Sequence, residues 1–521
     1  RNSLDGVTQA LVNETLIQSE GDVVIDASRN GRVVAEDSSD VAAGGTGVGL
    51  VVVTNNLMGG VSSALTQSDV TTTDSGGEAG DVSVTAKNTA LISAHLSSQL
   101  KAKTSVGVTL AFNSLGYANT NLLDDLAALV QRAENVTPGA AFFTHAVIDA
   151  SVLDLSGKLT VDAQSSGVID ALIESAALAV EADKSGSSAG ISVAPVAALN
   201  RIASTTFARI IGQDDLTIGT GIDLSAVDSA RINAEVAASS MAVAASGSGG
   251  STAVSVGLSL SRNEIDSQVD AGLLSTLGSA PEITVLTGQV TVDAERRGSI
   301  TANGRATAIG VSASSKGGPS VGGGGTLALN RIAGTSDARV DGVELTLDSL
   351  ADPGLFVVRS EDRATIDASL RSVAASVSVG GQSTQAVALG FSAARNLIGT
   401  VASPTPDFDL KASEYTQNNP LEVLTTGTRV LNDVGLLSGA VFEYVGPDLS
   451  PEEGVQLETA NFHDSEVWRE LTFEEAPGNA RALVSDSVVT TAGDVFVEAV
   501  SLSEINARVL AGAAAVGAAA G

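Results

Sequence analysis

The chain has 521 residues, of which 43% are hydrophobic and 17% charged, and it contains no cysteine. This composition excludes a disulfide-held scaffold, a thiolate metal site and a disordered, highly solvated chain. The 60 acidic residues outnumber the 28 lysines and arginines, which gives a net charge of −32, so nucleic acid and membranes are excluded as expected partners. Aromatic residues make up 3% of the chain, and the core must therefore be built from small and β-branched side chains.

The N-terminal residues lack the basic and apolar regions of a signal peptide, and the Ala/Gly-rich stretch 509–521 is too short to span a bilayer. The absence of cysteine is compatible with an exported bacterial protein. Since the last repeat stops part-way through, we expect the sequence to be a stretch of a far longer extracellular protein.

A repeated unit runs through the chain. Each copy opens with glycine and an alternating apolar segment, and eleven or twelve residues after that glycine a β-branched residue stands two positions before an alanine. The seven openings are GDVVIDA at Gly21, GDVSVTA at Gly80, GKLTVDA at Gly157, GIDLSA at Gly221, GQVTVDA at Gly288, GLFVVRS at Gly354 and GDVFVEA at Gly493. Such a period is the signature of a repeat protein.

The repeats predict strands, because apolar residues alternate with period two and Gly, Ser, Asn and Asp punctuate the segments. We expect each unit to hold several short strands with too little apolar surface to fold alone, so that neighbouring units must stack. The prediction is an all-β fold, a parallel β-solenoid of about seven units over residues 1–401 and 479–521. Long up-and-down hairpins with antiparallel pairing are the alternative.

An asparagine recurs after the Gly/Ser turn of the units, for example in VAALNRIAS and LALNRIAG. The six positions are Asn56, Asn113, Asn200, Asn263, Asn330 and Asn396. A solenoid places equivalent positions one above another, and a side-chain amide can donate to one neighbour and accept from the next. We therefore predict a structural ladder of asparagines.

Two insertions leave the repeat from the same place, which we interpret as one corner of the unit. The first, about residues 118–143, contains DDLAALVQRAEN, whose acidic start and apolar stripe predict a short helix. The second, residues 402–478, holds seven of the chain's fifteen aromatic residues and six of its eleven prolines. This shift in composition predicts a separate small β-domain.

Within the second insertion, GTRVL at Gly427, VFEYVG at Val441 and EVWREL at Glu466 resemble the "G..V...G..Y.Y.G......W..L" module of giant bacterial surface proteins. They also look distantly like the small chitin-binding modules of bacterial chitinases. The resemblance implies that Tyr444 and Trp468 would be exposed and stack on sugar rings. From the residues alone, the two rings are instead expected to form the core of the small domain.

The main body resembles the repetitive regions of giant bacterial exoproteins and filamentous-haemagglutinin-like adhesins, in which strings like "A.N.I....A.I" recur between glycine-opened strands. That resemblance implies a β-solenoid at the cell surface.

No catalytic constellation stands out, so we expect no enzyme and no cofactor. Glycoside cleavage needs two carboxylates facing each other across a cleft, and the acidic residues here are scattered singly along strands and turns. The histidines His95, His145 and His463 lack metal-ligand spacing. Turns near Asp214 and Asp215 are left open as weak calcium sites.

Small residues occupy alternate positions on both sides of many strands, as in SMAVAAS and TAIGVSAS. Only one side of a solenoid strand faces the core, so the other side is expected to be flat and apolar and to invite packing against copies of the chain. We predict a structural module of an extracellular surface or filament protein that assembles with itself. The alternative is an adhesin that binds polysaccharide through residues 402–478.

Overall fold

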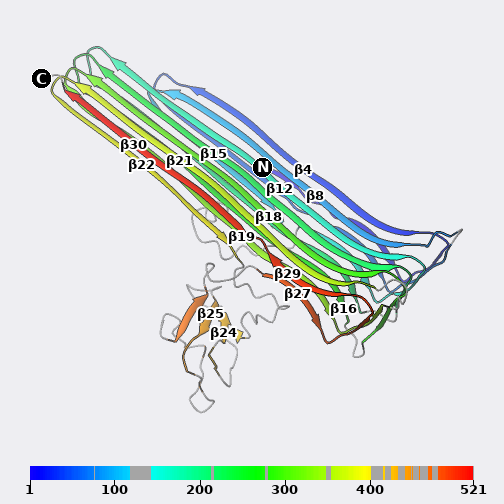
Figure 1. Cartoon of the computed structure of the whole chain (residues 1–521). Helices are drawn as coiled ribbons and strands as arrows, with labels where there is room; N and C mark the ends of the chain where they lie inside the picture. The colour runs from blue at the N-terminus through cyan, green and yellow to red at the C-terminus, as the bar shows by residue number, and fades with distance from the viewer. Residues whose placement is uncertain are drawn as a thin grey trace.

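The protein is described by a computed structural model of the whole chain. The described residues are 1–74, 77–117, 142–212, 216–275, 280–347, 354–399, 415–416, 424–426, 428–431, 441–447, 449, 457, 467–471 and 479–519. In these residues the body of the protein is a parallel β-solenoid of long strands (Figure 1). The solenoid prediction is therefore confirmed, whereas the predicted helix and the turn near Asp214 and Asp215 lie outside the described residues.

Three sheets run along the solenoid, and we name them the front, back and base sheets. The front sheet contains β4 (Val23–Ala42), β8 (Val82–Ala102), β12 (Lys158–Asp183), β15 (Gly221–Ser246), β18 (Gln289–Ser314), β21 (Phe356–Gly380), β29 (Val495–Ser501) and β30 (Glu504–Ala519). The base sheet contains β3 (Leu16–Ser19), β7 (Asp69–Thr72), β11 (Val152–Leu155), β14 (Leu216–Ile218), β17 (Glu282–Val285), β20 (Glu344–Leu347) and β28 (Val488–Thr491).

The back sheet combines long strands with shorter ones that continue the same line. Its members are β1 (Asn2–Leu4), β2 (Thr8–Asn13), β5 (Thr46–Leu57), β6 (Val61–Thr66), β9 (Thr104–Leu115), β10 (Phe143–Asp149), β13 (Ser188–Ile211), β16 (Ser251–Leu274), β19 (Gly317–Asp341), β22 (Ser383–Ile398) and β27 (Asn479–Ser485). Each coil passes from a front strand to a back strand and then to a short base strand, as β12, β13 and β14 do.

All described pairings between coils are parallel, and the front and back strands of one coil belong to different sheets. The antiparallel hairpin alternative is therefore wrong. The expectation of short strands is also wrong, because β12 and β15 each run for 26 residues, or about 86 Å at ~3.3 Å per residue. Their alternation continues without proline, and coils on both sides supply backbone partners along most of the length.

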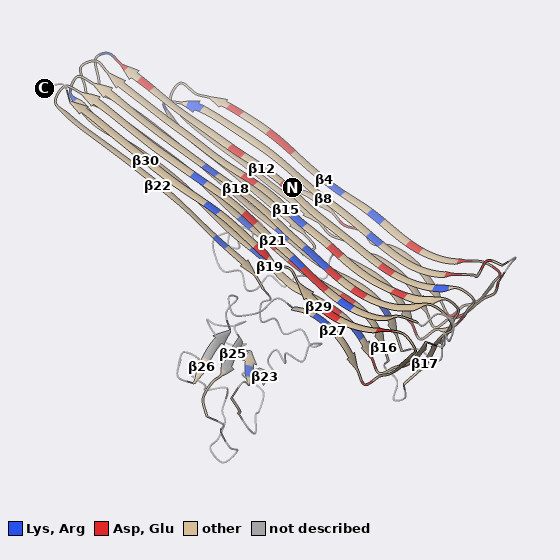
Figure 2. Cartoon of the chain, in the orientation of Figure 1, with Lys and Arg blue, Asp and Glu red and all other residues tan. Residues whose placement is uncertain are grey.

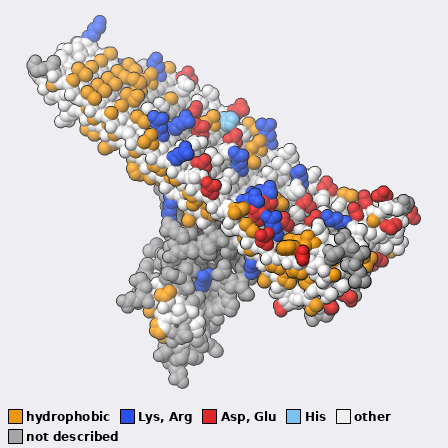
Figure 3. Space-filling view, in the orientation of Figure 1, with side chains coloured by type: hydrophobic (Ala, Val, Ile, Leu, Met, Phe, Trp, Pro, Cys, Tyr) orange, Lys and Arg blue, Asp and Glu red, His pale blue; other side chains and the backbone are white. Residues whose placement is uncertain are grey.

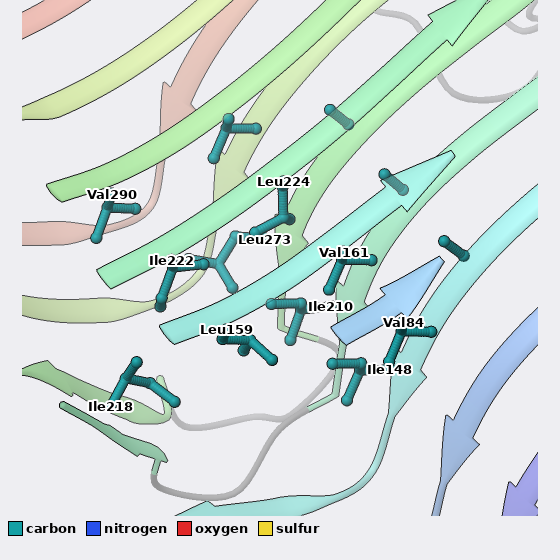
Figure 4. Packing of buried hydrophobic residues seen from close by; sticks show 14 of the residues in the cluster. Val84, Ile148, Leu159, Val161, Ile210, Ile218, Ile222, Leu224, Leu273 and Val290 are labelled. Carbon is teal, nitrogen blue, oxygen red and sulfur yellow. The ribbon is translucent and has the colours of Figure 1, made fainter. Parts of the chain in front are cut away.

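The widest part of the solenoid, which we call the base, is filled by large aliphatic side chains from all three sheets. Leu159 and Leu224 of the front sheet meet Ile210 of the back sheet and Ile218 of the base sheet (Figure 4), and all four are fully buried. Burial of one such side chain stabilises the fold by roughly 1.5–3 kcal/mol. The base sheet makes this core possible because it holds the front and back sheets apart.

Beyond the base sheet, the front and back sheets pack directly on each other. The β-branched residue of the repeated motif forms a column here, with Ile92, Ile169, Ile232 and Ile300 as successive register partners. Farther along, the core shrinks to residues such as Ala179 and Ala242. We call this far part the blade: front-strand residues 176–182 and back-strand residues 189–197, with their register partners in the other coils.

Candidate functional site

The asparagines form one continuous ladder inside the solenoid. In each step the Nδ2 of one asparagine donates to the Oδ1 of the asparagine in the next coil. The ladder runs Asn2, Asn55, Asn113, Asn200, Asn263, Asn330 and Asn396, with donor–acceptor distances of 2.7–2.8 Å. Side-chain amides thus repeat between coils the hydrogen bonding that the backbone makes, and every ladder bond points in the same direction along the chain.

Asn56 is not the ladder residue of its unit. Its register partner is Ser114, whereas Asn55 pairs with Asn113 and carries the ladder. A shift of one residue turns a strand side chain to the opposite face. The sequence contains a signal that identifies the ladder residue. Each ladder asparagine stands two positions before an aligned apolar residue, as Asn55 does before Leu57 and Asn113 before Leu115.

A second polar column, which we call the polar seam, separates the base core from the isoleucine column. It consists of Arg29, Asn88, Ser165, Asp228, Arg296 and Asp362, which are register partners in successive front strands. Its donor members reach backbone carbonyls on the back-sheet side: Arg29 to Met58, between β5 and β6, at 2.7 Å, Asn88 to Phe143 at 3.0 Å and Arg296 to Ala333 at 2.7 Å.

Two buried carboxylates flank Arg296 in the polar seam. Asp362 accepts a hydrogen bond from Arg296 at 2.7 Å, and both side chains are almost completely buried. Asp228 is fully buried on the other side, and this burial raises the pKa of its carboxyl group, against the opposing effects of Ser204, Ser165 and Arg296. The Arg296–Asp362 pair therefore links two coils inside the protein, and burial disfavours the ionised form of Asp228.

Ion pairs link coils on the outer side of the back sheet. Asp270 accepts from Arg209 at 2.8 Å and from Arg339 at 2.5 Å, and Asp337 lies 2.9 Å from Arg339 and 3.1 Å from Arg481. Burial raises the pKa of Asp337, while the two arginines oppose this rise. Each carboxylate is held between arginines of different coils, which is an arrangement suited to binding coils together.

Two of the three histidines, His95 and His145, lie on different sheets. His145 stacks on Phe207 with ring centroids 4.8 Å apart and an interplanar angle of 7°, and burial, aided by nearby Arg209, lowers its pKa to about 4. His95 lies on the outer side of the front sheet, 3.8 Å from Asp170. His463 lies outside the described residues. The structure therefore does not bring His95 and His145 together.

Residues of the second insertion form a small sheet of β23 (Tyr415–Thr416), β24 (Arg429–Leu431), β25 (Val441–Tyr444) and β26 (Trp468–Leu471). Tyr444 and Trp468 face each other across β25 and β26, with ring centroids 5.1 Å apart in an edge-to-face arrangement. They are only 3% and 6% exposed, and the Tyr444 hydroxyl donates to the carbonyl of Pro447 at 2.9 Å. Glycan stacking requires exposed rings, so this assignment is corrected: both rings belong to the core of the small sheet.

Both insertions interrupt the back sheet at the same register position. The first follows Leu115 and the second follows Ile398, which align with Ile202 and Ile332 of the uninterrupted strands β13 and β19. The common origin predicted from the sequence is thus found, but it lies in the middle of a strand line and not at a corner. In the coils of β13, β16 and β19 the chain simply continues across this point.

The fold defines a repeat protein of the parallel β-solenoid class. No protein-family model, no curated protein and no solved structure matches the chain. In the described part of the sequence, histidine and acidic side chains form no group of three or more placed to hold a metal ion. Within the same ranges, no helix has the length and apolarity that a membrane crossing requires.

Proposed function

We propose that this chain is a structural module of a very large extracellular bacterial surface or filament protein, in which stacked coils form the shaft and flat faces pack against copies. The asparagine ladder carries this proposal. It gives the coils one register from Asn2 to Asn396, and a stack in which each coil fixes the position of the next makes a stiff, extended object.

The buried polar groups support the same function. In the polar seam and in the ladder, one side chain of each coil occupies the same register position. The ion pairs of Asp270 and Asp337 with arginines join coils on the outer side of the back sheet. The ladder, the Arg296–Asp362 pair and the outer ion pairs use their polar atoms between neighbouring coils. The proposed role follows from this use, together with the resemblance of the repeats to giant exoproteins and filamentous-haemagglutinin-like adhesins.

The test combines location and shape. An antibody raised against the folded chain should label intact cells of the source organism, and negative-stain electron microscopy of the purified chain should show slabs with one long dimension set by the strands. Labelling that requires permeabilised cells would contradict an extracellular role. A compact round particle in the images would contradict the flat stack of long strands from which the shaft is built.

A further inference from the structure

The blade has an unusually thin interior. A Cβ atom added to Gly257 would lie 2.7 Å from the carbonyl oxygen of Thr307 on the facing strand, and one added to Gly310 would lie 2.7 Å from that of Val321. Real Cβ atoms do not approach other atoms so closely. The front and back sheets of the blade are therefore closer than the ~10 Å usual for packed sheets, and in the coil of β15 and β16 only glycine, alanine and serine lie between them.

Serine hydroxyls hold the two sheets of the blade together. Ser240 donates to the carbonyl of Ser192 at 2.8 Å, Ser312 to that of Ser251 at 2.9 Å and Ser376 to that of Ser320 at 2.6 Å. All three donors lie on the front sheet and all three acceptors on the back sheet. The interior of the blade is thus partly polar and contributes little apolar burial.

In the coils of β12, β15 and β18, the large apolar side chains on the front sheet of the blade point outward. On the front sheet, two rows across three coils consist of Leu178, Val180, Met241, Val243, Ile309 and Val311. Val180 is 44% exposed and Met241 39% exposed. Figure 3 shows this end of the front face as a continuous apolar area, and Figure 2 shows that the far ends of β15, β18 and β21 carry no charge.

The outer side of the back sheet also exposes large apolar side chains where small residues point inward. Val106, Val193 and Val256 are register partners in successive coils, and Leu258 lies beside them. Leu258 is 48% exposed, although its inward neighbours are Gly257 and Ser259. In the coil of β15 and β16, both outer faces of the blade therefore expose larger apolar groups than its interior buries.

The size of the front face suits a protein–protein contact. Strands β12, β15, β18, β21 and β30 are neighbours in it, and five strands ~4.8 Å apart over about eight residues give an area of about 600 Å². Two such faces would bury about 1,200 Å² in total, the lower limit for a stable interface. The area of one front face, about 600 Å², is also at the upper end of the apolar patches on ordinary monomers, which reach roughly 300–600 Å².

We propose that the blade is an interface between copies of this chain, in which the apolar outer face of one blade packs against a blade face of a second copy. The inference rests on the proposed structural function and names the partner. Packing of this kind would give the blade the apolar burial that its thin interior lacks. A bilayer fits less well, because the net charge of −32 repels anionic lipid.

Disulfide trapping tests the contact directly, because the natural chain has no cysteine. The variants are Met241→Cys on the front face, Val256→Cys on the back face and, as a matched control, Ser225→Cys, which lies on β15 outside the blade. We expect mild oxidation to give covalent dimers of one blade variant, or of the two mixed together, and not of the control. The three patterns report front-to-front, back-to-back and front-to-back contacts, and each supports the proposal.

Sedimentation measures the same contact without cross-linking. The natural chain should associate with increasing concentration, and Met241→Lys combined with Val311→Lys should raise the dissociation constant at least tenfold, with circular dichroism unchanged. Ser225→Lys should leave association as it was. A natural chain that stays monomeric at high concentration, or equal cross-linking of Ser225→Cys, would overturn the proposal.

A monomeric chain that floats with phosphatidylcholine vesicles would also overturn it and assign the blade to lipid. Either failure removes the packing against copies but leaves the extracellular shaft of stacked coils standing, because cell-surface labelling and particle shape do not depend on the blade contact. Conversely, labelling confined to permeabilised cells would reject the extracellular role even if cross-linked dimers formed.

Discussion

The base and the blade are built from the same strands, yet they distribute apolar side chains in opposite ways. In the base, large aliphatic residues such as Leu224 point inward and are fully buried. In the blade of the same strand, Ala242 and Ala244 point inward and Met241 points outward. The difference shows that one repeat can draw its stability from an internal core at one end and be short of such a core at the other.

The largest expected effect comes from the base core. Leu224→Ala should lower the free energy of unfolding by roughly 2–5 kcal/mol, because it removes a fully buried side chain and leaves a cavity. Met241→Ala on the outer face of the blade should cost far less in dilute, monomeric protein. Urea unfolding of both variants checks the comparison, and equal losses would show that the two regions do not differ.

A second test addresses the thin interior of the blade. Gly310→Val should destabilise the protein by roughly 1–3 kcal/mol, because the new side chain collides with the carbonyl of Val321 and forces the sheets apart. Thermal melting measures the loss. Ser239→Val, which points outward from the neighbouring strand, serves as the control, and a stable Gly310→Val variant would contradict the close spacing of the sheets.

The asparagine ladder is common to all coils and should show a middle-sized effect. Asn200→Ala should lower stability by about 1–3 kcal/mol, because it leaves the amides of Asn113 and Asn263 without one partner each. Asn330→Ala should behave likewise. Asn30→Ala, at an exposed asparagine of β4, is the control and should melt close to the natural protein. Unchanged melting of both ladder variants would remove the energetic role of the ladder.

The smallest effect is expected at Asp228 in the polar seam. Burial raises the pKa of this carboxyl group, so the folded protein binds more protons than the unfolded chain between the ordinary pKa near ~3.9 and the raised value. Stability from this group is therefore lost as pH rises through that window. Asp228→Asn should be more stable than the natural protein at pH 7, and urea unfolding should show this advantage shrinking as the pH falls toward 4. A constant difference across pH would contradict the account.

Much of the fold could be predicted because the repeats can be recognised in the amino-acid sequence. The glycine openings and the Ile-x-Ala motif predicted the coils and their parallel stacking. The recurrence of asparagine predicted the ladder except in the first full unit, where Asn55 and not Asn56 is the ladder residue. Strand length could not be predicted, since the short polar stretch between Asp162 and Ile169 looks like a break although neighbouring coils hold it extended. Tyr444 and Trp468 were recognised as a pair, but only packing decides whether a ring is buried.

The arrangement of the blade, with small residues inside and large apolar residues outside, could not be predicted either. In SMAVAAS both sets of alternating residues are small or apolar, so the pattern gives no direction. The distance between the sheets decides it, because Met241 cannot fit where Ala242 does. The polar seam was missed for a related reason: Arg29, Asn88, Ser165 and Asp228 share a register position but no chemical type.

The single direction of the asparagine ladder has a consequence for how the chain acquires its structure. Each asparagine donates to the residue of the coil that follows it in sequence, so a finished coil presents an amide donor and the open edges of its front, back and base strands to the next coil. The molecule can therefore fold vectorially, with every completed coil serving as the template for the one that emerges after it. A chain delivered from its N-terminus would need no distant segment before its first coils settle.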